Sequence, residues 1–379
     1  MAKEVKKTVV NAWNEWDPLK HVIVGRADGK MVQAPEPAIE RDFPDDGFPL
    51  GKYGPMPKEM TDKANDRLDN FAKILEKRGI RVDRPTPLDF SQTVQTPDWV
   101  QKSMVGCMPP RDVLLIIGNE IVEATMSYRS RWYEYLCYRP LVEQYFKEDP
   151  NMRWEAAPKP RLSERTYEKD FWKKWKALSQ GEQLERARKG DWVATEVEPL
   201  FDAASVGRFG KDLFVENSTV TNLAGIDWLR RHFPNHRIHK VMFDEEVPCH
   251  IDATFVPLRP GLVLQNRKRV PLIKEHTELF KRNGWEIVTC AQPAHDKKGR
   301  LSSCSVWLSM NLLVLDPKTV CVEAVETAQI EQLNKLGFEV VPVPFWDVAA
   351  FGGGLHCATA DVYREGKCED YFPKQVKGY

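Results

Sequence analysis

The chain has 379 residues, of which 42% are hydrophobic and 29% are charged, as in an ordinary soluble globular protein. Its 55 Lys and Arg residues are balanced by 55 Asp and Glu residues, so it lacks the basic surplus of nucleic-acid-binding proteins. Its apolar runs are too short for a transmembrane helix, so we expect no membrane partner.

Eight cysteines are scattered along the chain, without the paired spacing of zinc sites or the density of a disulfide scaffold. The first residues, Met1 to Lys7, lack the apolar core of a secretory signal. We therefore expect reduced thiols, a cytoplasmic location and no structural metal.

One supersecondary pattern recurs along the chain: a β-type run, often a hairpin, then a helical stretch and another apolar run. The first copy is incomplete, with a strand from His21 to Arg26, a helix from Thr61 to Arg78 and a strand from Ile80 to Val82. The later copies have hairpins near 112–124, 212–217 (turning near Asn217), 253–264 and 312–323, helices near 128–146, 226–229, 272–283 and 328–335, and closing strands near 153–156, 238–243, 285–288 and 338–343.

Five copies of one unit predict a repetitive, radially arranged α/β fold in a single domain spanning 1–379. The segment from about 161 to 190, rich in Lys, Glu and Trp, interrupts the pattern. We interpret it as a solvated helical insertion.

The stretch from Phe351 to Thr359 contains three consecutive glycines followed by His356 and Cys357. Glycines permit a tight turn and a close approach to a ligand, and a thiol presented in this way is a candidate nucleophile. The alternative is a glycine-rich turn beside a buried cysteine that acts as a small hydrophobe. His356 would point away from the site if the local chain is extended, and we interpret it as structural.

Other candidate residues lie at the junctions between units. Asp112 and Asp202 each precede a strand, although either is also a common cap of a turn or helix. His250 and Asp252 would share one face of a strand, because residues two apart face the same side; a hydrogen-bonded core histidine is the alternative.

A thiol, an imidazole and three carboxylates suit a small planar cation, since paired carboxylate oxygens match the forked N–H donors of a guanidinium. A thiolate attacking the central carbon of that group needs a proton donor for the leaving amine, which histidine supplies near neutral pH.

The chain resembles the arginine:glycine amidinotransferase family, whose members also act on other amines, over nearly its whole length. The motifs that carry the resemblance are Trp13 to Asp17, Arg111-Asp112, Gly118 to Ile121, Phe201 to Ala204, Val220 to Asn222, Trp228 to His232, His250 to Phe255, Trp307 to Asn311 and Gly352 to Cys357. Long motifs in the same order are a specific signal.

The resemblance implies a five-fold pseudosymmetric α/β propeller of ββαβ units, the pentein fold, and an arginine-dependent transferase without metal or other cofactor. It implies that Cys357 is the nucleophile, His250 the general acid and base, and Asp202 the carboxylate that orients the histidine. Asp112 and Asp252 would bind the guanidino group, and Arg269 and Ser305 the carboxylate of the donor.

The resemblance leaves the acceptor amine open. Val247, Cys249, Cys304 and Ala358 differ from the pattern of the animal glycine enzymes, so the acceptor is either a glycine-like amino acid or a precursor amine of a toxin or antibiotic. Two alternatives keep the same residues: a guanidino hydrolase such as an arginine deiminase, and a silent arginine-binding relative. The expected partners are small molecules, and a homodimer is compatible with the sequence.

Overall fold

The structure, a computed structural model, describes residues 8–39, 53–294 and 305–377. Within these ranges the strands form five three-stranded sheets and two two-stranded ones. In four of the three-stranded sheets, an antiparallel hairpin is followed by a helix and then by a third strand that runs parallel to the second. This order is expected, because a tight turn joins antiparallel strands whereas a parallel neighbour requires a crossover.

These four units follow one another along the chain. They are β7 Leu114–Ile117, β8 Glu120–Glu123, α2 Arg139–Glu148 and β9 Arg153–Ala156; β10 Val206–Phe209, β11 Asp212–Glu216, α5 Leu223–His232 and β12 Arg237–Val241; β13 Phe255–Arg259, β14 Leu262–Gln265, α6 Lys274–Arg282 and β15 Glu286–Thr289; and β16 Leu313–Asp316, β17 Thr319–Glu323, α7 Thr327–Lys335 and β18 Glu339–Val343.

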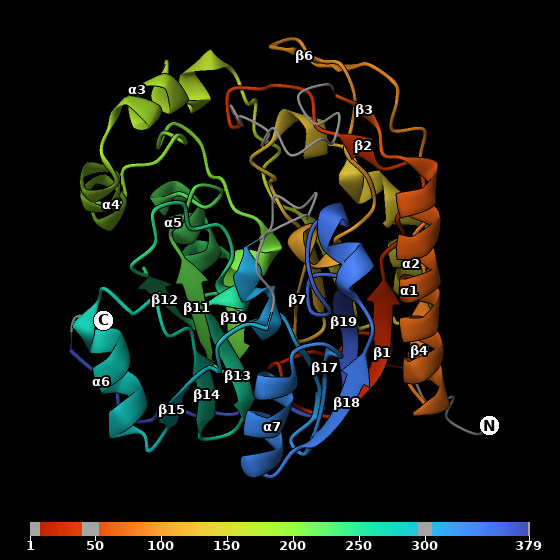
Figure 1. Ribbon diagram of the computed structural model, residues 1–379, viewed down its shortest axis with the longest axis vertical. Coiled ribbons are helices and arrows are strands. Elements are labelled where there is room, and N and C mark those ends of the chain that lie inside the picture. Colours follow the sequence, from red (N-terminus) through yellow and green to blue (C-terminus); the bar gives the residue numbers. More distant parts are fainter. Residues whose placement is uncertain (1–7, 40–52, 295–304, 378–379) are drawn as a thin grey trace.

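The fifth sheet is assembled from segments near the two ends of the chain. β1 (Leu19–Val24) runs antiparallel to β19 (Thr359–Arg364) and parallel to β4 (Arg81–Asp83), which follows helix α1 (Lys58–Lys77). β19 therefore occupies the place of the first hairpin strand and closes the ring of units (Figure 1). The predicted ββαβ repeat is confirmed, and the first copy looks incomplete in the sequence because its missing strand lies near the end of the chain.

The hairpins lie inside the ring and the helices outside it. β7, β8, β11, β14 and β17 are buried along their whole length. In Figure 1, α1, α5, α6 and α7 lie at the rim, around the strands. Neighbouring units share their cores: the ring of Phe214 on β11 packs 5.0 Å from that of Phe280 on α6.

Two predicted elements differ from the structure. The helix expected from Tyr128 begins only at Arg139, because Pro140 lacks an N–H group and is therefore tolerated only in the first turn of a helix. The turn of the third unit lies at Gly210, with φ of +67°, and not near Asn217. The backbone N–H of Asn217 instead donates to the carbonyl of Val241 and extends the pairing with β12.

The segment expected to be a helical insertion contains two short helices, α3 (Phe171–Ala177) and α4 (Gln180–Arg188), at the periphery of the ribbon in Figure 1. Ser179 and Glu182 form a capping box at the start of α4. Phe171 and Trp175 are buried in a cluster of aromatic and apolar side chains, so the segment is not solvated throughout.

The remaining strands form short pairs, β2 (Met31–Val32) with β3 (Gly54–Pro55) and β5 (Val94–Gln95) with β6 (Val100–Gln101). The helices that the structure describes include none with the length and apolar composition of a membrane span.

Candidate active site

A short 3-10 helix leads into each of the four continuous units. These helices are Pro110–Asp112 before β7, Ala203–Ser205 before β10, Ile251–Ala253 before β13 and Val306–Met310 before β16. Successive members of this series are in contact, and the first also contacts β19. The glycine-rich turn before β19 is the fifth lead-in segment. The ring thus gathers at one end the residues that the sequence spreads over about 250 positions, namely Asp112, Asp202, His250, Asp252, Ser305 and Cys357.

Glycine is required where the chain presents Cys357. Gly352 and Gly353 have φ of +123° and +151°, values that other residues rarely adopt. A Cβ atom on Gly353 would lie 2.4 Å from the Cβ and 2.6 Å from the Sγ of Cys357. The absence of a side chain at position 353 therefore leaves room for the thiol.

The thiol of Cys357 is held by two polar side chains. Its Sγ lies 3.3 Å from Oδ2 of Asp252, and Nδ2 of Asn311 donates to the sulfur over 3.1 Å. Asn311 also accepts the backbone N–H of Cys357 at 2.9 Å. Only 4% of Cys357 is exposed, so the thiol is surrounded by protein groups and not by solvent.

His356 points toward the site, contrary to the expectation for an extended chain, because residues 355–358 form a turn. Its Nδ1 lies 2.8 Å from Oδ2 of Asp252, the same oxygen that faces Cys357. Its Nε2 lies 3.4 Å from Oε2 of Glu15. A residue interpreted as structural is therefore in direct contact with the carboxylate beside the thiol.

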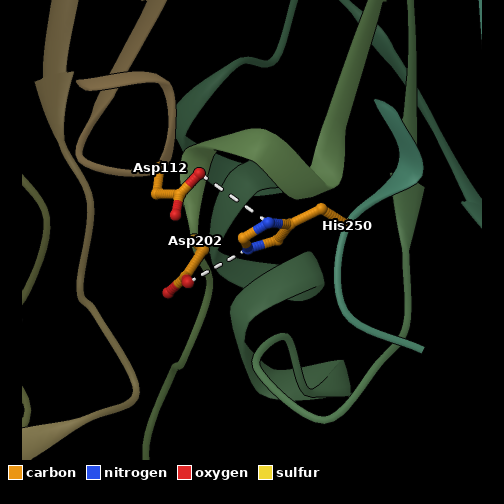
Figure 2. Close-up of side chains that lie close together, drawn as sticks. All are labelled: Asp112, Asp202 and His250. Carbon is orange, nitrogen blue, oxygen red and sulfur yellow. Dashed lines mark hydrogen bonds and ion pairs between the residues drawn. The ribbon is translucent and has the colours of Figure 1, made fainter. Parts of the chain in front are cut away.

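His250 lies between two carboxylates (Figure 2). Its Nε2 is 3.2 Å from Oδ2 of Asp202, and its Nδ1 is 3.7 Å from Oδ1 of Asp112. Burial acts to lower the pKa of His250, but Cys249, Asp112 and Asp202 together raise that pKa well above its usual value. The imidazole is therefore charged at neutral pH.

The local structure at His250 is not the strand that the sequence predicted. His250 is extended, with φ of −135°, and caps the 3-10 helix that contains Asp252. Burial acts to raise the pKa of Asp252, but its contacts with His356 and Cys357 and the nearby charge of His250 hold that pKa below its usual value. Asp252 is thus a charged neighbour of both the thiol and the catalytic candidate His250.

Arg131, which sequence reasoning missed, supports the two carboxylates that face His250. Its Nη1 lies 2.8 Å from Oδ2 of Asp112 and 3.9 Å from Oδ2 of Asp202. The Oδ1 atoms of both aspartates are buried and have no hydrogen-bond partner among the described residues. Oδ1 of Asp202 is therefore available to a donor that enters the site, and Oδ1 of Asp112, which forms only a long ion pair with His250, can accept a hydrogen bond from the same donor.

Asp112, Asp202 and His250 also lie close enough together to offer three ligand atoms to a metal ion. The permanent charge of Arg131 next to Asp112 opposes a divalent cation at that place. A flat cation with several N–H donors fits the unpaired oxygens better than a metal ion does.

Arg269 and Ser305 form a second cluster. Nη2 of Arg269 lies 3.0 Å from Oγ of Ser305 and 2.6 Å from Oε1 of Glu245, and its Nη1 lies 3.2 Å from Oγ1 of Thr254. Ser305 caps the 3-10 helix before β16. Cys304, the preceding residue, lies outside the described residues.

The buried Glu216, at the end of β11, lies between the two clusters. Burial and the charges of Glu245 and Asp252 raise its pKa to about 8, against the opposing charges of Arg269 and His250. Thr254, which contacts Arg269, caps the 3-10 helix that contains Asp252, so the pair of Arg269 and Ser305 adjoins the segment that carries Asp252.

Sequence reasoning missed Asn311, Arg131 and Glu15 as site residues. Glu15 and Asn311 belong to motifs that carry the family resemblance, but no spacing to another polar residue marks either of them. Their contacts arise only when the ring closes and brings Glu15 to His356 and Asn311 to Cys357.

A ring of ββαβ units with a cysteine, a histidine and carboxylates at one end of its axis defines an enzyme of the pentein class. The N-terminal domain of a cyanobacterial arginine dihydrolase shares this fold, with a TM-score of 0.57 at 14% identity, over 92% of this chain and 98% of that domain. The predicted fold class is confirmed.

The chain matches no family model. It is 41% identical over 367 residues to a mitochondrial glycine amidinotransferase of Danio rerio, covering 96% of this chain and 85% of that protein. It is 38% identical to an L-arginine:L-lysine amidinotransferase of Pseudomonas savastanoi pv. phaseolicola, covering 97% of this chain and 98% of that one. The solved structure of SxtG, an amidinotransferase of the saxitoxin pathway of Microseira wollei, gives a TM-score of 0.83 at 38% identity and covers 96% of this chain and 99% of that one. The chain belongs to the amidinotransferase family, and the predicted transferase class is confirmed.

Proposed function

We propose that this amidinotransferase moves the amidino group of L-arginine to a primary amine through a covalent intermediate on Cys357. The main support is the placement of the Cys357 sulfur 3.3 Å from Asp252, whose charge also interacts with His250, together with the two aspartates that flank His250. The guanidinium lies between Asp112, Asp202 and Asp252, and its N–H donors satisfy the Oδ1 atoms of Asp112 and Asp202, which are buried without a hydrogen-bond partner among the described residues.

The first half-reaction releases ornithine. The Cys357 thiolate attacks the guanidino carbon, and the bond from that carbon to the side-chain nitrogen of arginine breaks. His250, whose raised pKa keeps it protonated, gives its proton to the departing nitrogen. Asn311 donates to the sulfur and stabilises its negative charge before the attack.

The second half-reaction reverses these roles. An acceptor amine attacks the amidino carbon on sulfur, and His250, now neutral, takes a proton from that amine. The bond from carbon to sulfur breaks, which restores the thiolate and releases the new guanidino compound. Two steps through one covalent intermediate give ping-pong kinetics.

Arg269 and Ser305 bind the carboxylate of the donor in this proposal. They are in contact with each other and face the same region as Glu216. Glu245 already pairs with Arg269, so the carboxylate of the donor would share the guanidinium of Arg269 with Glu245. That competition weakens donor binding and favours release of ornithine.

Val247 and Cys249 are proposed to shape the space for the acceptor. Val247 is 41% exposed, whereas the carbonyl groups of Pro248 and Cys249 accept hydrogen bonds from the hydroxyl groups of Thr219 and Ser218. The relatives differ in the acceptors that their names give, glycine in one case and lysine in another. The hydrolase alternative is not favoured, because the reported relatives that are more than 30% identical to this chain are all amidinotransferases.

A labelling experiment tests the covalent intermediate. The wild-type enzyme incubated with L-arginine that carries an isotope in its guanidino carbon should retain the label on the peptide that contains Cys357. Cys357→Ala should retain none, and Cys368→Ser, a change of a remote cysteine, should retain the wild-type amount. Label that persists in Cys357→Ala would contradict the proposal.

A panel of amines tests which acceptor receives the amidino group. The enzyme, L-arginine and single amines (glycine, lysine or 4-aminobutyrate) are incubated, and mass spectrometry identifies the amine that gains an amidino group. Release of citrulline in place of ornithine would contradict transfer. The seven described cysteines form no disulfide with one another, which supports the proposed cytoplasmic location. The homodimer stays a prediction, and light scattering, which measures the mass of the particle in solution, would test it.

A further inference from the structure

A buried chain of charged groups leads away from the thiol and is not used by the steps above. It runs from Asp252 to His356 at 2.8 Å, from His356 to Glu15 at 3.4 Å, and from Glu15 to Arg208 at 2.6 Å. Asp252, His356 and Glu15 line one cavity. His356 is thus a buried imidazole with a carboxylate at each of its two ring nitrogens.

We propose that His356 is a positioning residue that engages Oδ2 of Asp252 and supplies the positive charge which lets the neighbouring Cys357 thiol ionise. The inference rests on Cys357 being the nucleophile of the proposed function. Its geometric basis is that a single oxygen, Oδ2 of Asp252, contacts both the thiol and the imidazole. Without His356, the carboxylate would face the sulfur with its full charge and oppose a thiolate.

The groups around His356 favour its charged form. Asp252 comes from the lead-in segment of β13 and Glu15 from the segment before β1, and both attract an imidazolium. Arg111, from the lead-in segment of β7, is the opposing charge. Burial and Arg111 act to lower the pKa of His356, but its contacts with Asp252 and Glu15 raise that pKa above its usual value.

The charges close to the thiol support the same conclusion. Arg111 and Arg208 are both paired with Glu15 and Asp361, so neither is available to the sulfur as an unpaired cation. Arg111 also donates from Nε to the carbonyl of His356 at 3.4 Å, which holds the backbone of the turn. The charged His250 also acts on Asp252, but its ring nitrogens face Asp112 and Asp202. Among the described residues, His356 is the cation whose ring contacts the Asp252 oxygen that touches Cys357.

The test measures thiol ionisation and does not need turnover. The rate at which iodoacetamide alkylates Cys357 is followed against pH by mass spectrometry of the peptide that contains it. We expect the apparent thiol pKa to rise by roughly one unit or more in His356→Ala, the effect typical of losing an opposite charge nearby. His356→Asn keeps a donor for Asp252 without the charge, and should show a rise of intermediate size.

His232→Asn is the matched control, because His232 also pairs with a buried glutamate, Glu120, but lies on helix α5 away from the thiol. It should leave the alkylation profile unchanged. If both His356 variants keep the wild-type pH dependence of alkylation, the inference is overturned. The isotope label on Cys357 tests the proposed function separately.

A second measurement reads the protonation of His356 in the unaltered protein and needs a variant only to assign its signal. Nitrogen NMR of histidine-labelled enzyme reports the protonation of each of its eight imidazoles, and the His356→Asn spectrum identifies the signal of His356. We expect the signal of an imidazolium at neutral pH. A neutral ring at that pH would overturn the inference.

Discussion

Asn311 is joined to Cys357 twice, since its Oδ1 accepts the backbone N–H of Cys357 and its Nδ2 donates to the sulfur. One side chain therefore fixes both the position of the nucleophile and the donor that it faces. The orientation of this amide follows from the two contacts, because only this orientation places an acceptor at the N–H and a donor at the sulfur.

Asn311→Asp tests the donor to the sulfur. The change keeps the acceptor for the backbone N–H but replaces the donor with a charged oxygen, which repels a thiolate. We expect ornithine release to fall by about 100-fold or more, the effect of removing one preorganised donor from an active site. A thermal unfolding curve checks that the fold persists. Activity equal to that of the wild type would remove Asn311 from the role.

Gly353→Ala tests the presentation of the thiol. The added Cβ would meet Cys357 at 2.4 Å, so either the turn or the cysteine must shift. We expect activity to fall by about 100-fold, because such displacements misplace the attacking atom. Gly181→Ala is the matched control, as no atom lies within 4 Å of its added Cβ. Equal activity of both variants would contradict the expected clash.

The pH dependence of ornithine release tests His250 as the acid. Because its pKa is raised, His250 is protonated at neutral pH and loses its proton only as the pH rises through that raised value. The rate of a single turnover should therefore be level through neutral pH and fall on the alkaline side. His250→Gln should abolish this fall along with most of the activity. A rate that instead increases through the usual histidine range, near about pH 6.5, would show that the neutral imidazole is required.

Glu216→Gln tests the buried carboxyl group between the two clusters. Its pKa is raised from 4.5 to about 8, so between these values the folded protein holds a proton that the unfolded chain has lost. The free energy of unfolding therefore decreases as the pH rises from 4.5 to 8 because of this group. Glu216→Gln should remove that decrease and stabilise the protein more at pH 8 than at pH 5.

Urea unfolding at the two pH values measures the effect. The exposed Glu143→Gln on α2 is the control and should show no pH-dependent gain. A gain for Glu216→Gln that is the same at both pH values would show that the carboxyl group is ionised throughout.

Local patterns predicted most of the fold. The hairpin of β7 and β8 was expected because two apolar runs flank Gly118-Asn119, and its strands pair as expected. The sequence could not indicate that β1 pairs with β19, because more than 300 residues separate them and no turn connects them. The single domain over 1–379 stays a prediction.

Members of the candidate site could be proposed from the sequence where a residue has chemistry of its own and lies in a distinctive motif, as Cys357 and His250 do. The direction of His356 was wrong, because it depends on whether the glycines make a turn or an extended segment. Arg131 could not be assigned either, since an arginine in the sequence carries no sign of which carboxylate it meets. Such contacts depend on the packing of separate units.

The strand that completes the ring also follows directly on Cys357, the proposed nucleophile. Cys357 lies just ahead of β19, whose pairing with β1 is the last to become available as the ribosome extends the chain. A nascent or prematurely terminated polypeptide that stops short of this point has neither its reactive sulfur nor a closed circle of units. Chemical competence and structural completion are therefore expected to be acquired together, and polypeptides that end before Cys357 are expected to be inactive.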